Sequence, residues 1–261
     1  MTLLLELTDL LWLIVIAVLA MLLMRERGRL KAYSLKGPWP IVAVWPHEID
    51  PVFAEGPYGP GLRTEVGYVG RGPYGVPGGT SDGEAWILAV LAKEATCLFE
   101  FGTCTGKTAY LWARNTAHDA SIITLTLAPE HRSEYRPGMD DDRRSSTFAL
   151  AESSFSAFLY SGTDVAHKVS QCFGDSKTFD VSPWAEKCDL VFVDGSHAYS
   201  YVVSDTAKAM DLVRPGGLVL WHDYAGPRHC PDVFRALNEL SHRLALVRIR
   251  GTTIVAYRRP A

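Results

Sequence analysis

The segment that most constrains the fold runs from Cys97 to Thr108, where an apolar stretch ends at Glu100 and a glycine-containing turn leads directly into a helical sequence. The apolar stretch predicts a buried strand, and Thr108 to Ala113 predicts the helix after it. Glycine lets the backbone turn sharply, and the first turn of a helix presents free N–H groups to its surroundings. A strand, turn and helix in this order are typical of the first unit of a doubly wound α/β sheet.

Two other nucleotide-binding loops contain similar residues, and both fail on spacing. A P-loop requires Gly-x-x-x-x-Gly-Lys-Ser/Thr, but the residue five positions before Gly106 is Phe101. The dinucleotide fingerprint requires glycine at positions 104 and 107, where this chain has Cys104 and Lys107. A tight turn that binds no ligand remains the alternative at this point.

The composition describes a globular protein. A chain of 261 residues, 48% hydrophobic and 21% charged, can bury the core of one α/β domain. Its net charge of −3 gives no reason to expect a nucleic-acid partner. The five cysteines are odd in number and include no C-x-x-C pair, which favours neither a disulfide framework nor a structural zinc site.

The N-terminal segment differs from the rest of the chain. Residues 10–24 carry no charge, and a helix that started at Leu3 would be about 33 Å long, enough to cross the ~30 Å hydrocarbon core of a bilayer. The next segment, Arg25 to Lys31, is basic, so the positive-inside rule places the rest of the chain in the cytoplasm. We therefore expect a transmembrane anchor over residues 3–24 in a single-pass membrane protein with a cytoplasmic catalytic domain. A buried or interfacial helix is the alternative.

Residues 25–79 are expected to form a basic flank and a long loop. The stretch 31–79 holds ten of the 22 glycines and eight of the 15 prolines, and it shows no helix or strand period. Long loops of this kind are usually functional or linking segments. The main domain is expected over residues 80–261, where Ser81-Asp-Gly-Glu84 forms a capping box for its first helix.

Strand-like and helix-like segments alternate after this point. Further strands are expected over residues 121–127, 169–173, 188–193 and 218–221. Further helices are expected over residues 146–160, 201–212 and 232–243, and a solvated loop over 129–145. The last two strand-like segments, 244–249 and 252–257, predict an antiparallel hairpin. This order indicates a mostly parallel sheet with a reversed terminal strand.

Two further motifs stand at the expected ends of strands. They read Val193-Asp-Gly-Ser-His-Ala-Tyr199 and Pro215-Gly-Gly followed by His222-Asp-Tyr224. With Glu100-x-Gly-x-x-x-Gly106 in register before them, residues 80–257 resemble the class I S-adenosylmethionine-dependent methyltransferases, within a branch related to macrolide-sugar O-methyltransferases. The resemblance implies a doubly wound, mostly parallel, seven-stranded Rossmann-like sheet with a reversed C-terminal strand, preceded here by the expected transmembrane helix.

The resemblance also implies the cofactor S-adenosyl-L-methionine (SAM). Its methionine part would be held at the glycine turn, and its adenine would lie beside the third of the expected strands. The residues implied for cofactor binding are Glu100, Gly102, Thr103, Gly106, Thr126, Asp175 and Ser176.

Two positions depart from the family pattern. Cys104 stands where the family usually has its middle glycine, and Thr126 stands where an acid usually binds both ribose hydroxyls. A threonine offers one hydroxyl and no charged bidentate acceptor. Glu130, four residues further on, is a candidate replacement.

Four titratable residues are expected at the carboxyl ends of neighbouring strands, where open α/β sheets bind their ligands. Of these, Asp194, His197 and His222 are the candidate catalytic residues, with His222 as the general base because imidazole titrates near neutrality. Relatives in this branch hold magnesium with acids at these strand ends, and Asp194 and Asp223 match two of those positions. His222 replaces a further acid, and magnesium prefers oxygen, so Mg²⁺ or another divalent metal is the alternative to a direct base.

Together these features predict a membrane-anchored SAM-dependent methyltransferase. Oxygen of a small-molecule, glycan or lipid-linked acceptor is the expected target, with the N-terminal helix in the membrane. Two alternatives remain: a metal-dependent enzyme of other chemistry on the same fold, and a non-catalytic membrane scaffold that retains the cofactor fold.

Overall fold

The computed structural model describes residues 12–25, 39–56, 59–60, 64–66, 78 and 80–261. The chain divides into two compact units, Met1–Pro40 and Ile41–Ala261. The site and its chemistry belong to the second unit.

The described part of the first unit contains a helix over residues 12–25. Its 14 residues extend about 21 Å, less than the ~30 Å of a hydrocarbon core. Among the described residues, no helix has the length and apolar character needed to cross a membrane. The expected transmembrane anchor over residues 3–24 is therefore wrong, and so is the single-pass localisation derived from it. Residues 3–11 of that prediction lie outside the described residues.

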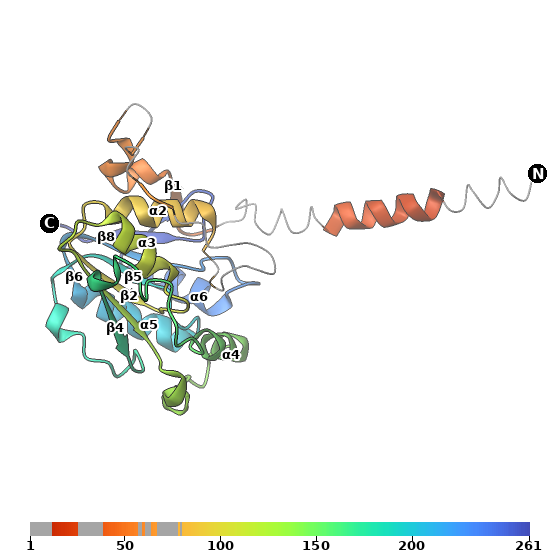
Figure 1. Ribbon diagram of the computed structural model, residues 1–261. Helices are drawn as coiled ribbons and strands as arrows, with labels where there is room; N and C mark the ends of the chain where they lie inside the picture. The colour runs from red at the N-terminus through yellow and green to blue at the C-terminus, as the bar shows by residue number, and fades with distance from the viewer. Residues whose placement is uncertain (1–11, 26–38, 57–58, 61–63, 67–77, 79) are drawn as a thin grey trace, which may run out of the picture. The chain divides into compact units, whose positions relative to one another are not determined.

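The second unit is built on one eight-stranded sheet with the order β1-β7-β8-β6-β5-β2-β3-β4 (Figure 1). Neighbouring strands run parallel except that β8 is antiparallel to both β6 and β7, as expected for a reversed last strand. The strands are β1 (Val42–Val44), β2 (Cys97–Phe101), β3 (Ser121–Thr126), β4 (Val169–Phe173), β5 (Cys188–Val193), β6 (Val213–Trp221), β7 (Val247–Ile249) and β8 (Val255–Arg258).

The expected number of seven strands is wrong because of β1. This strand lies in the segment expected to be a loop, and it pairs in parallel with β7. Three residues, Val-Ala-Val, are too few to show an alternating pattern among the surrounding prolines and aromatic residues. Two short 3-10 helices follow it, η1 (Pro46–Glu48) and η2 (Pro51–Ala54). The boundary at residue 80 between loop and domain stays a prediction.

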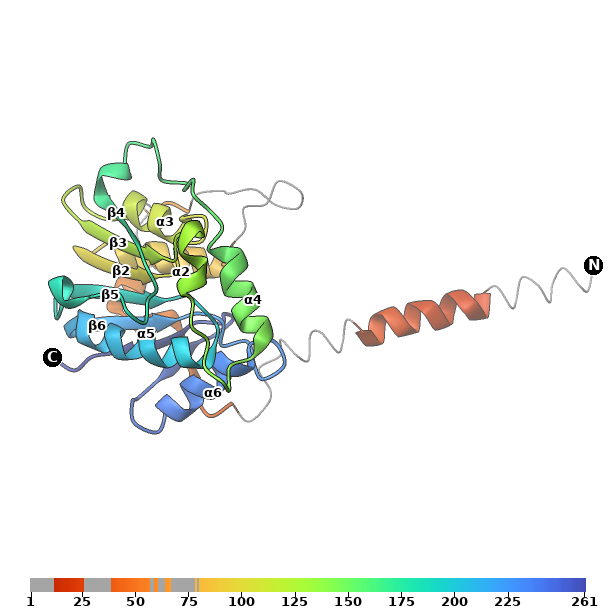
Figure 2. The same ribbon diagram turned by 90° about the horizontal axis from the view of Figure 1, so that it is seen from below.

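Helices cover both faces of the sheet. They are α2 (Asp82–Ala92), α3 (Lys107–Asn115), α4 (Arg143–Glu152), α5 (Tyr199–Leu212) and α6 (Pro231–Leu240). Side chains alternate along each strand, so Leu98 packs in the core cluster that contains residues of α2 and α3. On the opposite face, the Trp221 indole donates a hydrogen bond of 2.8 Å to Thr206 of α5. Figure 1 shows α2 and α5 on opposite sides of the sheet, and in Figure 2 α4 and α6 lie toward the same end of the domain.

The first helix of the domain begins as the sequence predicts. Ser81 Oγ accepts a hydrogen bond of 3.2 Å from the Glu84 N–H, and the Glu84 carboxylate accepts one of 2.8 Å from the Ser81 N–H. This capping box satisfies two N–H groups that a helix start leaves without partners. It also fixes the Glu84 side chain on the inside of the domain, where it is 3% exposed.

Gly102 is required by the way two strands end side by side. The residue follows β2 with φ of 100°, a conformation that favours glycine. A Cβ at this position would lie 2.0 Å from the carbonyl oxygen of Asp194, just beyond β5. The glycine is therefore needed to close the sheet, independently of any ligand that approaches it.

We expect Gly102→Ala to lower the free energy of unfolding by about 3 kcal/mol or more, because the added carbon meets backbone atoms and the left-handed φ is unfavourable for alanine. Gly83→Ala in α2 is the matched control, since nothing lies within 4 Å of its Cβ position. It should change stability by no more than about 1 kcal/mol, in the stabilising direction. Chemical denaturation of both variants measures the two effects, and equal stabilities would contradict the packing argument.

Candidate active site

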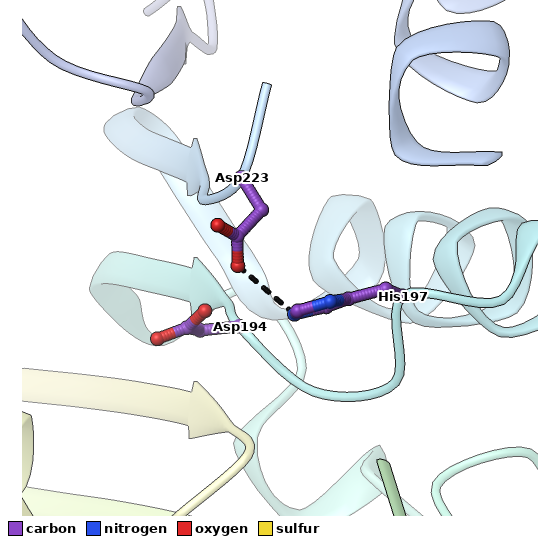
Figure 3. A group of neighbouring side chains, drawn as sticks. All are labelled: Asp194, His197 and Asp223. Atoms are coloured by element: carbon purple, nitrogen blue, oxygen red, sulfur yellow. Dashed lines mark ion pairs between the residues drawn. The ribbon is translucent and has the colours of Figure 1, made fainter. Parts of the chain in front are cut away.

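Four polar side chains meet where β5 and β6 end. Asp194 follows β5, His222 and Asp223 follow β6, and His197 lies in the loop that leads into α5. His197 Nε2 lies 2.9 Å from Asp223 Oδ2, and His222 Nδ1 lies 3.0 Å from Asp194 Oδ1 and 3.1 Å from Asp223 Oδ2. Figure 3 shows the His197 and Asp223 side chains pointing toward each other, with Asp194 beside them at the end of the neighbouring strand. The structure thus brings together all four residues that the sequence placed at the strand ends.

His222 is the most deeply placed of the four, with 5% of its surface exposed. One ring nitrogen faces Asp194 and Asp223, and the other lies 3.5 Å from a Glu84 carboxylate oxygen. Burial alone would lower the pKa of His222, but the charges of the two aspartates and their hydrogen bonds outweigh it and raise that pKa well above the ordinary value. His222 therefore lies between the carboxylates of Asp194 and Asp223 on one side and that of Glu84 on the other, and its positive charge stabilises all three.

Glu84 is a component of this site that the sequence pattern places only in a helix cap. One of its oxygens accepts hydrogen bonds from the N–H and the hydroxyl of Thr253, at 2.7 and 2.8 Å. Burial would raise the pKa of Glu84, but the hydrogen bond and charge of His222, with the N–H groups of Thr253 and Ser81, lower it to about 2. A glutamate three residues into a helix carries no sequence signal that it reaches a strand end.

The two aspartates respond differently to their surroundings. Burial raises the pKa of Asp194, against the attraction of His222. Burial would also raise the pKa of Asp223, but His222 and His197 together outweigh it and lower that pKa. Burial would lower the pKa of His197, but the hydrogen bond to Asp223 and the charges of Asp223, Glu152 and Asp194 together outweigh it and raise that pKa. Asp223 also has a φ of 59°, which is uncommon outside glycine and recurs at functional sites.

A pocket opens beside the ends of β2, β3, β4 and β5. Four of the residues expected to bind the cofactor line it: Gly102, Thr126, Asp175 and Ser176. Tyr135 also lines it and stacks on Tyr201 with ring centroids 4.5 Å apart. We call this the first pocket.

Three other residues expected to bind the cofactor, one in β2 and two in the glycine turn, do not line this pocket. The Glu100 carboxylate accepts a hydrogen bond of 2.6 Å from Thr124, and burial raises the pKa of Glu100 to about 8. The Thr103 hydroxyl lies 2.8 Å from that of Thr124. At Gly106, a Cβ would meet the Tyr160 ring at 2.7 Å. These residues stabilise the turn by contacts with Thr124 of β3 and with the Tyr160 ring.

Hydrogen bonds fix the position of Asp175, which lies at the polar end of the first pocket. Asp175 accepts hydrogen bonds of 2.9 Å from the Lys177 N–H and of 2.9 Å from the Tyr201 hydroxyl. Thr126 lines the pocket at the end of β3, whereas Glu130 is not among its lining residues. Glu130 therefore does not take the place of the missing ribose-binding acid in this structure.

A second pocket adjoins the first and contains the histidines. His197, His222 and Asp223 line this second pocket, with residues of α4 and of the segment between β6 and α6, His229 among them. Cys104, Glu152 and Asp194 line both pockets and so form the boundary between them. Cys104 has a φ of 45°, which explains why glycine suits this position.

Glu152 is the other site residue that the sequence does not reveal. It ends α4, and burial, with the charges of Asp194 and Asp223, raises the pKa of its carboxyl to about 7 against the attraction of His197. Nothing in the helical sequence marks this glutamate as different from a solvated one. Only the packing of α4 over the strand ends brings it to the boundary.

Asp194, His197 and Asp223 also form a candidate metal site. One ligand atom from each lies within 4.8 Å of the others. Two carboxylates and one imidazole suit ions that accept nitrogen, such as Mn²⁺ or Zn²⁺, better than Mg²⁺. The donor set therefore fits a divalent ion, with His197 as a ligand that the sequence pattern did not include.

Comparison with known proteins identifies the class. A family model described as a methyltransferase domain matches residues 99–224. Similar solved structures include the O-methyltransferase TomG from Streptomyces achromogenes in complex with SAM, at 22% identity over 66% of this chain and 77% of that chain, with a TM-score of 0.43. An O-methyltransferase from Bacillus cereus in complex with S-adenosylhomocysteine (SAH) shares 17% identity over 66% and 78%, with a TM-score of 0.43. No curated protein sequence matches the chain.

The matched residues run from β2 to just after β6 and include the glycine turn and both strand-end motifs. The matched domain is that of a class I S-adenosylmethionine-dependent methyltransferase. The resemblance drawn from the motifs is therefore confirmed, and the chain is an enzyme of this class. This sets aside the non-catalytic scaffold and the enzyme of other chemistry.

The Glu84 carboxylate should make stability depend on pH in the acid range. A carboxyl whose pKa falls from 4.5 to about 2 on folding stabilises fully above its unfolded pKa and loses that effect as pH falls toward 2. We expect Glu84→Gln to cost about 1–3 kcal/mol at pH 7 and less at pH 3. Urea unfolding at both pH values measures the difference.

Glu94→Gln is the control for this variant, because Glu94 is exposed just after the end of α2. Its stability should match that of the wild type at both pH values. A Glu84→Gln deficit that stays constant or grows between pH 7 and pH 3 would contradict the assignment.

Proposed function

We propose that this methyltransferase acts on a hydroxyl oxygen of a small acceptor. The observation that carries the proposal is the meeting of two pockets at Asp194, Cys104 and Glu152. The first pocket has the lining expected for the cofactor, and the second contains a His–Asp pair suited to removing a proton. The expectation of a lipid-linked acceptor depended on the membrane helix and is not carried further.

The first pocket fits SAM. Gly102 lines it at the glycine turn, Thr126 offers one hydroxyl, and Asp175 and Ser176 supply polar atoms at the far end. Tyr135 adds an aromatic surface to the same pocket. When bound, the cofactor supplies a methyl group on a positively charged sulfur. The chain's task is then to align the acceptor with that methyl group and to take up the hydroxyl proton.

His197 is the better candidate for the general base. Its Nε2 is held by Asp223 at 2.9 Å, an arrangement that orients an imidazole and stabilises its protonated form. Its ring lines the second pocket, where its Nδ1 would accept the proton of an acceptor hydroxyl. His222, which the sequence favoured, has carboxylates near both of its nitrogens and is the more buried ring. We therefore assign His222 to positioning Asp194 and Asp223.

The alternative mechanism uses a divalent metal. Asp194, His197 and Asp223 would hold the ion, which would lower the pKa of an acceptor hydroxyl bound to it. In that case His197 would be a ligand and could not serve as the base. The two mechanisms differ in their response to chelation.

The donor assignment is tested by filling the first pocket. Ala149 of α4 lines it, so Ala149→Trp should weaken SAH binding at least about tenfold by occupying the cofactor's space. Ala151→Trp on the same helix is the matched control, because Ala151 is exposed and does not line the pocket. Titration calorimetry measures both. A wild type that binds neither SAM nor SAH at millimolar concentration would overturn the cofactor assignment.

The base is tested by turnover with radiolabelled SAM and the best acceptor from a panel of hydroxylated small molecules. His197→Ala should lower kcat about 10²–10⁴-fold and leave the Kd for SAH nearly unchanged. Activity should persist in a chelator. Complete loss of activity in the chelator, restored by Mn²⁺ or Mg²⁺, would instead support the metal mechanism.

A further inference from the structure

We propose that the acceptor carries an anionic group, a carboxylate or a phosphate, which Arg144 and Arg228 bind at the mouth of the second pocket. This inference rests on the proposed function, because it describes the molecule whose hydroxyl would reach His197. It narrows the acceptor to hydroxylated compounds with a negative charge away from the reacting oxygen.

Acidic and basic side chains both line the second pocket, and the acidic ones include Asp142 and Glu152. The buried end contains Asp194 and Asp223 with the two histidines, whose side chains are only 4% to 24% exposed. Arg144 and Arg228 line the same pocket and are exposed. They come from different elements, the first turn of α4 and the segment between β6 and α6.

Neither guanidinium has an ion pair or a side-chain hydrogen bond within the part of the chain that the structure describes. Arg114 and Arg258, in contrast, are paired with carboxylates: Arg114 with Glu65 and Asp164, and Arg258 with Asp50. Asp142 is the acidic group nearest in sequence, and its Oδ1 accepts a hydrogen bond of 2.6 Å from the Arg144 N–H as the cap of α4. Two such guanidiniums on one pocket suit an oxyanion that each can contact through several N–H groups.

An apolar surface lies between the two ends. Phe148 of α4 is 53% exposed and stacks on His197 with ring centroids 5.5 Å apart. One face of the phenyl ring supports the imidazole, and the rest of its surface is free to contact an acceptor. An acceptor of this shape would place its hydroxyl at His197, its body against Phe148 and its anionic group at the arginines.

The test uses matched pairs of probes that differ in charge. These are 3,4-dihydroxybenzoate with its methyl ester, and glucose 6-phosphate with glucose. Binding to the SAH-loaded protein is measured by calorimetry at low ionic strength, where exposed charges are least screened. At least one anionic probe should bind about tenfold more tightly than its neutral partner.

The double variant Arg144→Gln/Arg228→Gln should remove that preference and leave the Kd for SAH unchanged. Arg143→Gln is the matched control, because Arg143 is exposed on the same helix turn and does not line the pocket. The inference is overturned if no anionic probe is preferred, if the preference survives in the double variant, or if Arg143→Gln removes it equally. Failure of the wild type to bind SAH would be a separate result, against the proposed function itself.

Discussion

The contact on which the site depends is that of one buried imidazole with three carboxylates. His222 lies against Asp194 at the end of β5, Asp223 after β6, and Glu84 at the start of α2. Three carboxylates placed this close would repel one another in a low-dielectric interior. A shared imidazole reduces that repulsion and brings the ends of β5 and β6 into one geometry. The orientation of His197 follows, because its partner Asp223 is held from the other side.

The sequence predicts the parts of the fold that repeat over several residues. The strands at 169–173 and 188–193 occur at the residues expected for them, and the capping box at Ser81 starts the helix as expected. The prediction of secondary structure fails where an element is too short to show a periodic pattern, and the prediction of a membrane anchor fails because an apolar run alone does not define one. The strand β1 has only three residues, and a charge-free run of 15 residues suggests an anchor that the described helix does not form.

For the site, the sequence predicts which residues lie together at the strand ends, but it does not predict their roles. Residues directly after a strand lie at a known edge of the sheet, so the sequence alone suffices to place Asp194, His197, His222 and Asp223 together. Their roles do not follow from it, because burial and mutual distance decide which imidazole reaches an acceptor. Glu84 and Glu152 sit on helices, where the sequence does not reveal which face turns toward the strand ends.

The boundary between the two pockets has a consequence for how this enzyme could diverge. Cys104, Asp194 and Glu152 form it, and each comes from a different element: the glycine turn, the end of β5 and the end of α4. A change in the length or tilt of α4 would move Glu152 without disturbing the sheet that positions the other two. The same helix carries Arg144 and Phe148, which we expect to contact the acceptor. Residues of this one helix would therefore determine both which acceptor binds and how closely the two pockets approach each other. Variation confined to that helix could exchange one acceptor for another while the donor side stays the same.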